Sequence, residues 1–396
     1  MDCFSKLQSC DVDQVPTHTK SAVDHFLHNK SLLTSSEGLS PLLQVIHNSS
    51  SSISLRGIDV LFRILHSLSV DHVDLISVLL QESNIIPEIS NLLDSSDVLS
   101  KLALLELFAD VLDNRHISLC FLHLPSFKEL LTKIQVLGTE SVSSSDYQDV
   151  FLFNSIIFFI SHLCHLPKEL LKPFLTLIRK AQSKAEDTLL VSLNAIGKLL
   201  SVENSRTILL EEKPASASLA VSLITHSLTP SSRPVSAPTS LTAKHAIATA
   251  LMSEAQHPGP ISIVTAFEHA SRRINLPYPN AAYEQCMRAK GDDDASLASI
   301  RLVEGLCGLK TGLQGLTRVA GFIEWLTSSE PHLASDVAHA KLQLLKRVND
   351  VETELRKSGQ GLLSDATLVK IREKLMRGPF GGAGEYVVEV GEHVSE

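Results

Sequence analysis

Histidine and cysteine side chains recur in one segment at spacings that could hold a metal ion. The set consists of His116, Cys120, His123, His162, Cys164 and His165. Steps of three and four residues turn side chains to one side of a helix, and imidazoles and thiolates bind zinc from such arrangements. The same residue types also fill the interiors of leucine-rich helices. We favour this structural interpretation and predict no metal site, with a metal-dependent or hydrolytic activity of this segment as the alternative.

Two other patterns have structural explanations. The acidic run 292–294 could bind a cation, but it precedes a helix expected from about Ala295, where carboxylates stabilise the unpaired backbone amides. The glycines within 381–384 follow no strand, so they predict no dinucleotide site. The sequence contains no nucleophile elbow, phosphate loop, paired-histidine zinc motif or kinase signature. We therefore predict a protein that is not an enzyme and needs no cofactor.

Composition limits the partners and the compartment. The 396 residues are 44% hydrophobic and 20% charged, with a net charge of −9, which disfavours nucleic acid as a partner. The six cysteines form no close pair and the N-terminus shows no signal-peptide core, so we expect the cytoplasm or the nucleus. The longest apolar run, 151–163, is shorter than the roughly 20 residues of a membrane span and predicts a buried helix. No membrane association is expected.

Helical periodicity covers most of the chain. In the segment 97–114, apolar residues recur at steps of three and four, and Ser95, Ser96 and Asp97 precede them as candidate N-caps. This stripe comprises Leu102, Leu105, Phe108, Ala109 and Leu112. Alternating patterns typical of strands are scarce. The sequence thus predicts an all-α protein.

An eight-residue apolar frame repeats along these helices. Its copies are 58–65, 102–109, 153–160, 193–200, 244–251, 300–307 and 340–347. Their separation brackets the roughly 40 to 47 residues of armadillo and HEAT repeats. We predict an armadillo/HEAT-like α-solenoid of stacked helical repeats, with a generic helical bundle as the alternative. The expected divisions are N-terminal helices at 1–50, with a degenerate cap repeat as one interpretation, repeats at 51–378 with a Pro/Ser-rich loop at 229–240, and a flexible tail at 379–396.

The second position of the frame should project from each repeat into solvent. The residues at this position are Asp59, Ala103, Asn154, Asn194, His245, Arg301 and Lys341. Stacked repeats would align them along one face, and their polarity could orient a partner protein. We select Asn154, Asn194, His245, Arg301 and Lys341 as candidate partner-binding residues. With Trp325 as the chain's single tryptophan, a tryptophan-lined peptide groove of the importin type is disfavoured.

The C-terminal part of the sequence resembles the family of 26S proteasome non-ATPase regulatory subunit 5. The resemblance lies in the segment 185–212, in RLVEGLCGL followed by RVAGFIEWL at 318–326, and in LVKIREKLMRGPF at 368–380. Within this signature, Phe322 and Trp325 should seal the repeat core and Gly321 should allow a tight turn. Gly378 and Pro379 should end the last helix.

This resemblance implies a non-catalytic chaperone that assembles the base of the proteasome regulatory particle. Family members bind the C-terminal domain of a base ATPase subunit in a curved face and leave before the mature particle forms. The expected partners are therefore ATPase subunits of the base. The alternative function is that of another armadillo/HEAT-repeat adaptor or scaffold for protein–protein interaction.

Overall fold

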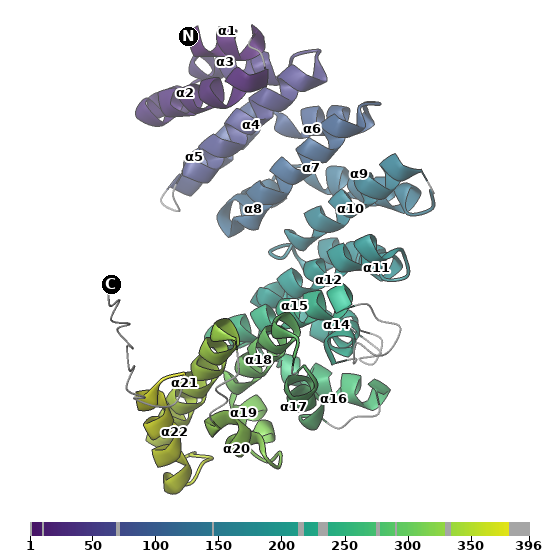
Figure 1. Cartoon of the computed structure of the whole chain (residues 1–396). Helices are drawn as coiled ribbons and strands as arrows, with labels where there is room; N and C mark the ends of the chain where they lie inside the picture. The colour runs from purple at the N-terminus through teal and green to yellow at the C-terminus, as the bar shows by residue number, and fades with distance from the viewer. Residues whose placement is uncertain are drawn as a thin grey trace, which may run out of the picture. The chain divides into compact units, whose positions relative to one another are not determined.

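The computed structural model describes residues 2–9, 12–68, 72–144, 146–212, 218–228, 237–274, 278–289, 291–328 and 334–379. Every regular element in these ranges is a helix (Figure 1). None of these helices is long and apolar enough to cross a membrane. The predicted all-α, solenoid-like architecture is confirmed, because successive helices pack in ordered rows.

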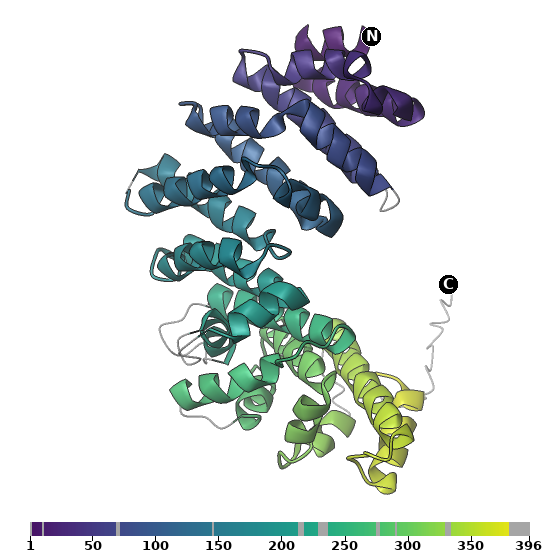
Figure 2. The same cartoon turned by 180° about the vertical axis from the view of Figure 1, so that it is seen from behind.

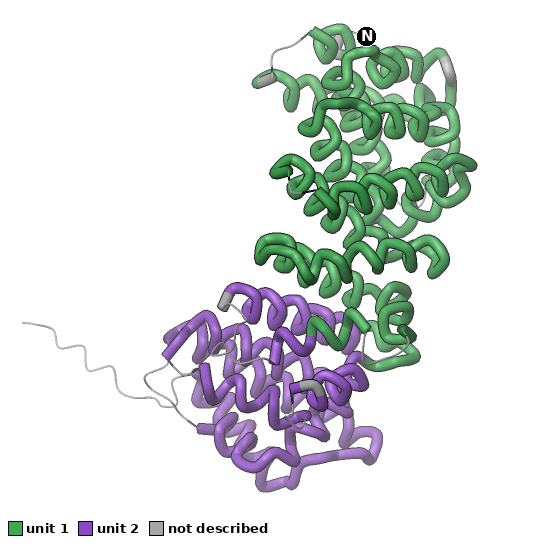
Figure 3. Tube along the Cα trace, turned by 90° about the vertical axis from the view of Figure 1, so that its right-hand side faces the viewer, with its two compact units in different colours: residues 1–223, 257–262 green, residues 224–256, 263–396 purple. Residues whose placement is uncertain are grey.

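The chain divides into two compact units (Figure 3). Unit 1 comprises residues 1–223 and 257–262, and unit 2 comprises residues 224–256 and 263–396. The boundary lies within α14 (Leu219–Leu228) and inside the range 51–378 that we expected to form one array. The described residues of the N-terminal segment 1–50 form helices, and α2 (Val15–His28) and α3 (Ser36–Ile46) pack against α4 (Ser51–Ser67) within unit 1.

Unit 1 is built around a row of long helices, each packed against the next. We call α2, α4, α7, α10 and α12 the long-helix row (Figures 1 and 2). Its helices are α2 (Val15–His28), α4 (Ser51–Ser67), α7 (Val98–Asp113), α10 (Tyr147–Ser161) and α12 (Glu186–Ser201). The helices outside this row are α1 (Asp2–Ser9), α3 (Ser36–Ile46), α5 (Val73–Ser83), α6 (Ile85–Asp94), α8 (Arg115–Leu122), α9 (Phe127–Ser141), α11 (Lys168–Ala181) and α13 (Glu203–Leu210), with 3₁₀ turns at Val12–Gln14 and Lys30–Thr34.

Unit 2 continues the pattern with three long helices, α15, α18 and α21, packed in succession. Their bounds are α15 (Ala237–Gln256), α18 (Asp293–Cys307) and α21 (Ser335–Lys357). The shorter helices are α16 (Ile263–Ile274), α17 (Asn280–Arg288), α19 (Lys310–Leu316), α20 (Phe322–Thr327) and α22 (Asp365–Arg377). Each of the seven frame copies falls inside a different long helix, four in unit 1 and three in unit 2, so the frame identifies one helix per repeat.

Two helix starts have side-chain caps at residues that the sequence indicated. The Asp97 side chain accepts a hydrogen bond from Leu99 N, and α7 runs from Val98 to Asp113, within one residue of the predicted segment at each end. The Asp292 side chain accepts from Ala295 N, so the acidic run caps α18 as expected. Such caps satisfy amides that the helix itself leaves unpaired.

Phenylalanines join neighbouring repeats in unit 1. The Phe108 ring of α7 stacks on Phe62 of α4 at 5.9 Å and on Phe159 of α10 at 5.5 Å, measured between ring centroids. Phe121 of α8 and Phe127 of α9 pack against the ring of Phe108. All five side chains are buried. Burial of each contributes about 2 to 3 kcal/mol, and the interlocked rings fix the register between successive repeats.

The C-terminal signature builds the core of unit 2. The Phe322 and Trp325 rings form one cluster with Tyr283, and Phe322 is fully buried. Gly321 precedes α20 with a φ of 81°, a left-handed conformation that glycine adopts without steric cost. Gly378, with a φ of 74°, follows the last residue of α22. The predicted structural roles of these residues are confirmed.

The last four residues of the predicted Pro/Ser-rich loop at 229–240 are helical. Residues 229–236 lie outside the described residues, but 237–240 form the first turn of α15, with Thr239 and Ser240 buried. This turn is helical because its side chains pack into unit 2, although its composition is typical of a loop. Of the predicted tail at 379–396, residues 380–396 also lie outside the described residues.

Candidate partner-binding face

Two of the candidate residues lie on the solvent side of the long-helix row. Asn194 of α12 is exposed, and Asn154 of the neighbouring α10 is half-buried. The side-chain oxygen of Asn154 is itself buried and accepts no hydrogen bond from the described residues. Asp59 and Ala103, at the same frame position, are also partly exposed. In unit 1 the frame therefore identifies an outward-facing position.

Two of the three candidates in unit 2 also reach solvent. His245 of α15 is exposed. Arg301 of α18 is partly exposed, and its Nη1 lies 2.8 Å from Glu304 Oε2 one turn later on the same helix. This ion pair neutralises Arg301, so the residue contributes less positive charge to the surface than the sequence suggested.

The expectation that Lys341 faces solvent is wrong. Its exposed fraction is 7%, and its Nζ donates hydrogen bonds to Ser328 O at 3.2 Å and Ser328 Oγ at 3.0 Å. The ammonium group also lies 5.1 Å from the centre of the Trp325 ring. The cause is α20, which packs against α21 and covers the side that would otherwise be open. Lys341 is thus part of the core of unit 2, where its charge is stabilised by carbonyl and ring contacts.

Lys244 is a second buried lysine, at a position where the repeated frame predicts an apolar residue. It occupies an apolar position of α15, is 5% exposed, and donates to Ser299 Oγ on α18 at 3.0 Å. Burial lowers the pKa of its ammonium group, and the nearby Cys286 and Asp292 oppose that shift. The contact joins the two most extensively packed helices of unit 2.

An ion pair shows that α7, α10 and α12 expose side chains on the same side of unit 1. Lys198 Nζ of α12 lies 2.9 Å from Asp113 Oδ1 of α7, although α10 is packed between the two helices. His162, at the end of α10, interacts electrostatically with both residues of the pair. The outer sides of the three helices therefore form one continuous face.

Three exposed aromatic side chains on this face were missed by the sequence reasoning. Tyr147, Phe151 and Phe158 project from α10 with exposed fractions of 73%, 44% and 40%. We call these three residues the aromatic stripe. The run 151–163 predicted a buried helix, and most of α10 is indeed buried, but Phe151 and Phe158 are not. The missed signal is the spacing of four and seven residues, which places all three rings on one side of the helix.

A groove adjoins this face on the other side of α7. It has a volume of about 570 Å³ and lies between α2, α4 and α7. Its walls include Lys20, Arg63, Asp110 and Leu107, and Arg63 Nε is paired with Asp59 Oδ1 at 2.8 Å. The mixture of charged walls and apolar floor can accept a side chain of a bound protein.

The His/Cys segment has no geometry for metal binding in the part of the chain that the structure describes. No group of three or more His, Cys, Asp or Glu side chains there could hold an ion. Cys120 and Cys164 are buried, and burial raises the pKa of the Cys164 thiol to about 11. Burial likewise raises the pKa of Cys286 to about 12. The raised pKa values keep the thiols of Cys164 and Cys286 protonated near neutral pH, which makes both weak nucleophiles.

Comparisons with known proteins give no family assignment. No family model and no curated protein matches the chain. Among solved structures, the chain is similar to the crystal structure of an engineered protein from the Northeast Structural Genomics Consortium. The sequence identity is 13%, the TM-score is 0.33, and the match covers 82% of this chain and 98% of the other.

Proposed function

We propose that the protein is a non-catalytic chaperone for assembly of the base of the 26S proteasome regulatory particle. It would bind the C-terminal domain of a base ATPase subunit, in the cytoplasm or the nucleus, and leave before the mature proteasome forms. The observation that carries the proposal is the ordered C-terminal signature, whose residues 318–326 and 368–377 supply α20 and α22. The buried residues of this signature pack inside unit 2, so they support the family resemblance. They do not identify the residues that contact a partner.

The physical basis of such a function is a rigid surface made of packed helices. Interlocked aromatic residues hold the long-helix row in register, so the row can present side chains to a folded partner without much loss of conformational freedom. A scaffold that occupies one surface of an ATPase domain prevents other proteins from docking there. Assembly order would then follow from competition for that surface, with no reaction step.

The second candidate is a helical-repeat adaptor or scaffold unrelated to the proteasome. It is supported by the stacked helices of the described residues, an architecture that adaptors and scaffolds share. It would use the same exposed face of unit 1 and differ only in its partner.

Affinity capture separates the two functions. The tagged full chain is captured from cells under native conditions, and its partners are identified by mass spectrometry. We expect base ATPase subunits, without core-particle subunits, and direct binding of the purified chain to at least one recombinant ATPase C-terminal domain. Absence of base ATPases from the captured material, together with no binding to any of the recombinant domains, would refute the chaperone proposal and favour the adaptor.

A further inference from the structure

We propose that the aromatic stripe of α10 and the carboxylates of α7 beside it bind an amphipathic helix that carries lysine or arginine next to its apolar side. The inference rests on the proposed protein-binding function and specifies the chemistry of the bound segment. It concerns unit 1 alone and does not depend on which protein supplies the helix.

Aromatic exposure is concentrated at this place. Every other described Phe, Tyr or Trp side chain is buried or partly buried, whereas Tyr147, Phe151 and Phe158 are exposed together on α10. The Tyr147 and Phe151 rings pack edge to face with centroids 4.5 Å apart, which restricts their motion. Grouped apolar side chains that remain in water mark interaction sites, and restricted aromatic rings lose little entropy when they are covered.

Negative charge borders the aromatic stripe. Because Phe108 of α7 stacks on Phe159 of α10, the turns of α7 that carry Glu106 and Asp110 lie level with Phe158. Both carboxylates are exposed, and neither forms an ion pair or a side-chain hydrogen bond with another described residue. Asp113, one turn further, is already paired with Lys198. Asp110 also lines the groove that contains Lys20 and Arg63, where Arg63 is already paired with Asp59. Two exposed carboxylates that form no ion pair, beside an aromatic surface, attract a cationic side chain and repel an acidic one.

The dimensions of the aromatic stripe favour a helix as the occupant. Tyr147 and Phe158 are eleven residues apart, which corresponds to about 16 Å along a helix axis. A partner helix that lies along α10 can place aliphatic residues over the rings at steps of three and four. Its flanking lysines or arginines then reach Glu106 and Asp110, while the exposed amide of Asn194 lies on the opposite side. The result is an apolar centre with a polar rim.

Synthetic peptides test the inference on the intact chain. The first probe is a labelled amphipathic helix of roughly 18 residues with a leucine side flanked by lysines, and the second has glutamate in place of each lysine. Fluorescence anisotropy should show binding of the lysine peptide and at least about tenfold weaker binding of the glutamate peptide. The double variant Phe151→Ala/Phe158→Ala should weaken binding of the lysine peptide about tenfold or more.

A second variant tests the charges without touching packed side chains. Glu106→Gln/Asp110→Asn should weaken binding by roughly three- to tenfold at low salt, and the loss should shrink as salt is raised. The matched control is Val369→Ala/Met376→Ala, which removes two exposed apolar side chains from α22 and should leave binding unchanged. Circular dichroism verifies that each variant is folded.

Particular outcomes would overturn the inference. Equal binding of the two peptides, or affinities of both unit 1 variants within twofold of the original chain, would exclude this face as the site. The chaperone proposal fails separately: if the peptide results fail while the original chain still captures base ATPases, the face is wrong and the function stands. If the peptide results hold and no ATPase is captured, the face stands and the proteasome function is wrong.

Discussion

At the residue scale, the same type of side chain takes opposite roles according to what covers it. Lys198 lies at the surface and bridges α12 to α7, whereas Lys341 is buried against Trp325 and Ser328. A buried ammonium group is tolerated only where carbonyl, hydroxyl or ring contacts replace its water. Local sequence does not distinguish the two, because Lys341 is covered by α20 rather than by its own helix.

Lys341 and Asn194 should therefore differ in their effect on stability. Lys341→Ala should lower the free energy of unfolding by about 2 kcal/mol, because it removes two hydrogen bonds, a ring contact and the packing of the aliphatic stem. Asn194→Ala, on the exposed side of α12, should change it by less than about 0.5 kcal/mol. Urea denaturation measures both. If the two variants have equal stability, Lys341 does not have the buried contacts described above.

The histidines at the end of α10 should make unit 1 sensitive to acid. Burial is the main cause that lowers the pKa of both His162 and His165 from the ordinary value of 6.5, and Lys198 adds to the effect at His162. Asp113 opposes the shift at both residues, and Asp110 and the Phe158 carbonyl oppose it at His162. The unfolded chain therefore binds more protons just below pH 6.5, so stability is fully present above pH 6.5 and falls as the pH drops.

The test compares unfolding free energies over a pH series. Between pH 7 and pH 5 the original chain should lose more stability than His162→Gln/His165→Gln, which cannot titrate there. His245→Gln, on the exposed side of α15, is the matched control and should follow the original chain. Identical slopes for all three proteins would contradict the role assigned to the buried imidazoles.

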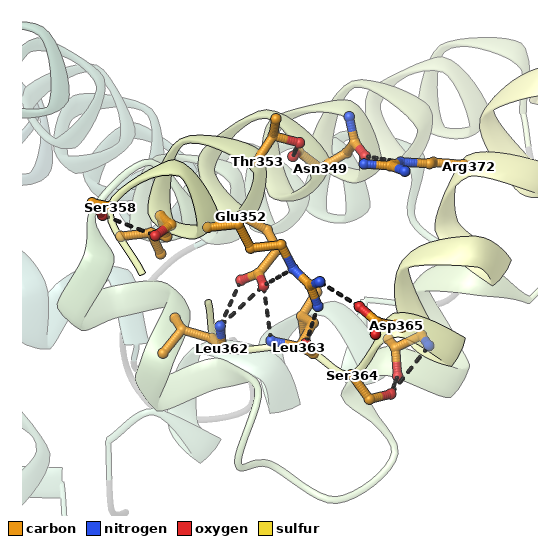
Figure 4. A network of polar contacts seen from close by, with 12 residues as sticks. Asn349, Glu352, Thr353, Ser358, Leu362, Leu363, Ser364, Asp365 and Arg372 are labelled. Atoms are coloured by element: carbon orange, nitrogen blue, oxygen red, sulfur yellow. Dashed lines mark hydrogen bonds and ion pairs between the residues drawn. The ribbon is translucent and has the colours of Figure 1, made fainter. Parts of the chain in front are cut away.

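At the element scale, one buried carboxylate holds the turn that joins α21 to α22 (Figure 4). Glu352 is fully buried, and its two oxygens accept hydrogen bonds from Leu362 N at 3.0 and 2.9 Å and from Leu363 N at 3.1 Å. Arg356 Nε completes the set at 2.9 Å, and Arg356 also binds Asp365 at the start of α22. These hydrogen bonds and the ion pair with Arg356 offset the free-energy cost of burying the carboxylate of Glu352.

Removal of this charge should destabilise the C-terminal helices. Glu352→Gln should lower the free energy of unfolding by about 3 kcal/mol, because an amide has one acceptor oxygen and turns an NH₂ group toward donors. Glu354→Gln is the control on the same helix, where the side chain is 71% exposed and contacts Lys357, and it should cost less than about 0.5 kcal/mol. Thermal and urea unfolding measure the difference. A loss for Glu352→Gln as small as that of the control would show that the turn is held by other contacts.

At the scale of the whole molecule, stacked repeats make stability local. Each long helix packs mainly on its neighbours in the row, and contacts group into two units. In such an array the effect of a destabilising change decreases with the number of repeats that separate it from the observed helix. Unit 1 should therefore keep its structure when the end of unit 2 is weakened.

Hydrogen exchange of the Glu352→Gln variant tests this locality. Backbone amides of α21 and α22 should exchange faster than in the original chain, while those of α4, α7 and α10 should keep their rates. Glu354→Gln should leave both sets unchanged. A uniform acceleration across all the helices would mean that the chain unfolds as a single cooperative body.

The sequence by itself determined the helical architecture, one long helix for each frame copy, and the starts of helices such as α7 and α18. These features depend on periodicity and capping, which act between residues a few positions apart. It also indicated the structural roles of Gly321, Phe322 and Trp325. Only the tertiary structure decided that Lys341 is buried, that the rings of α10 are exposed beside Glu106 and Asp110, and that the chain divides within α14. Those outcomes depend on which distant helix covers a given side, and that is fixed by packing between repeats rather than by local sequence.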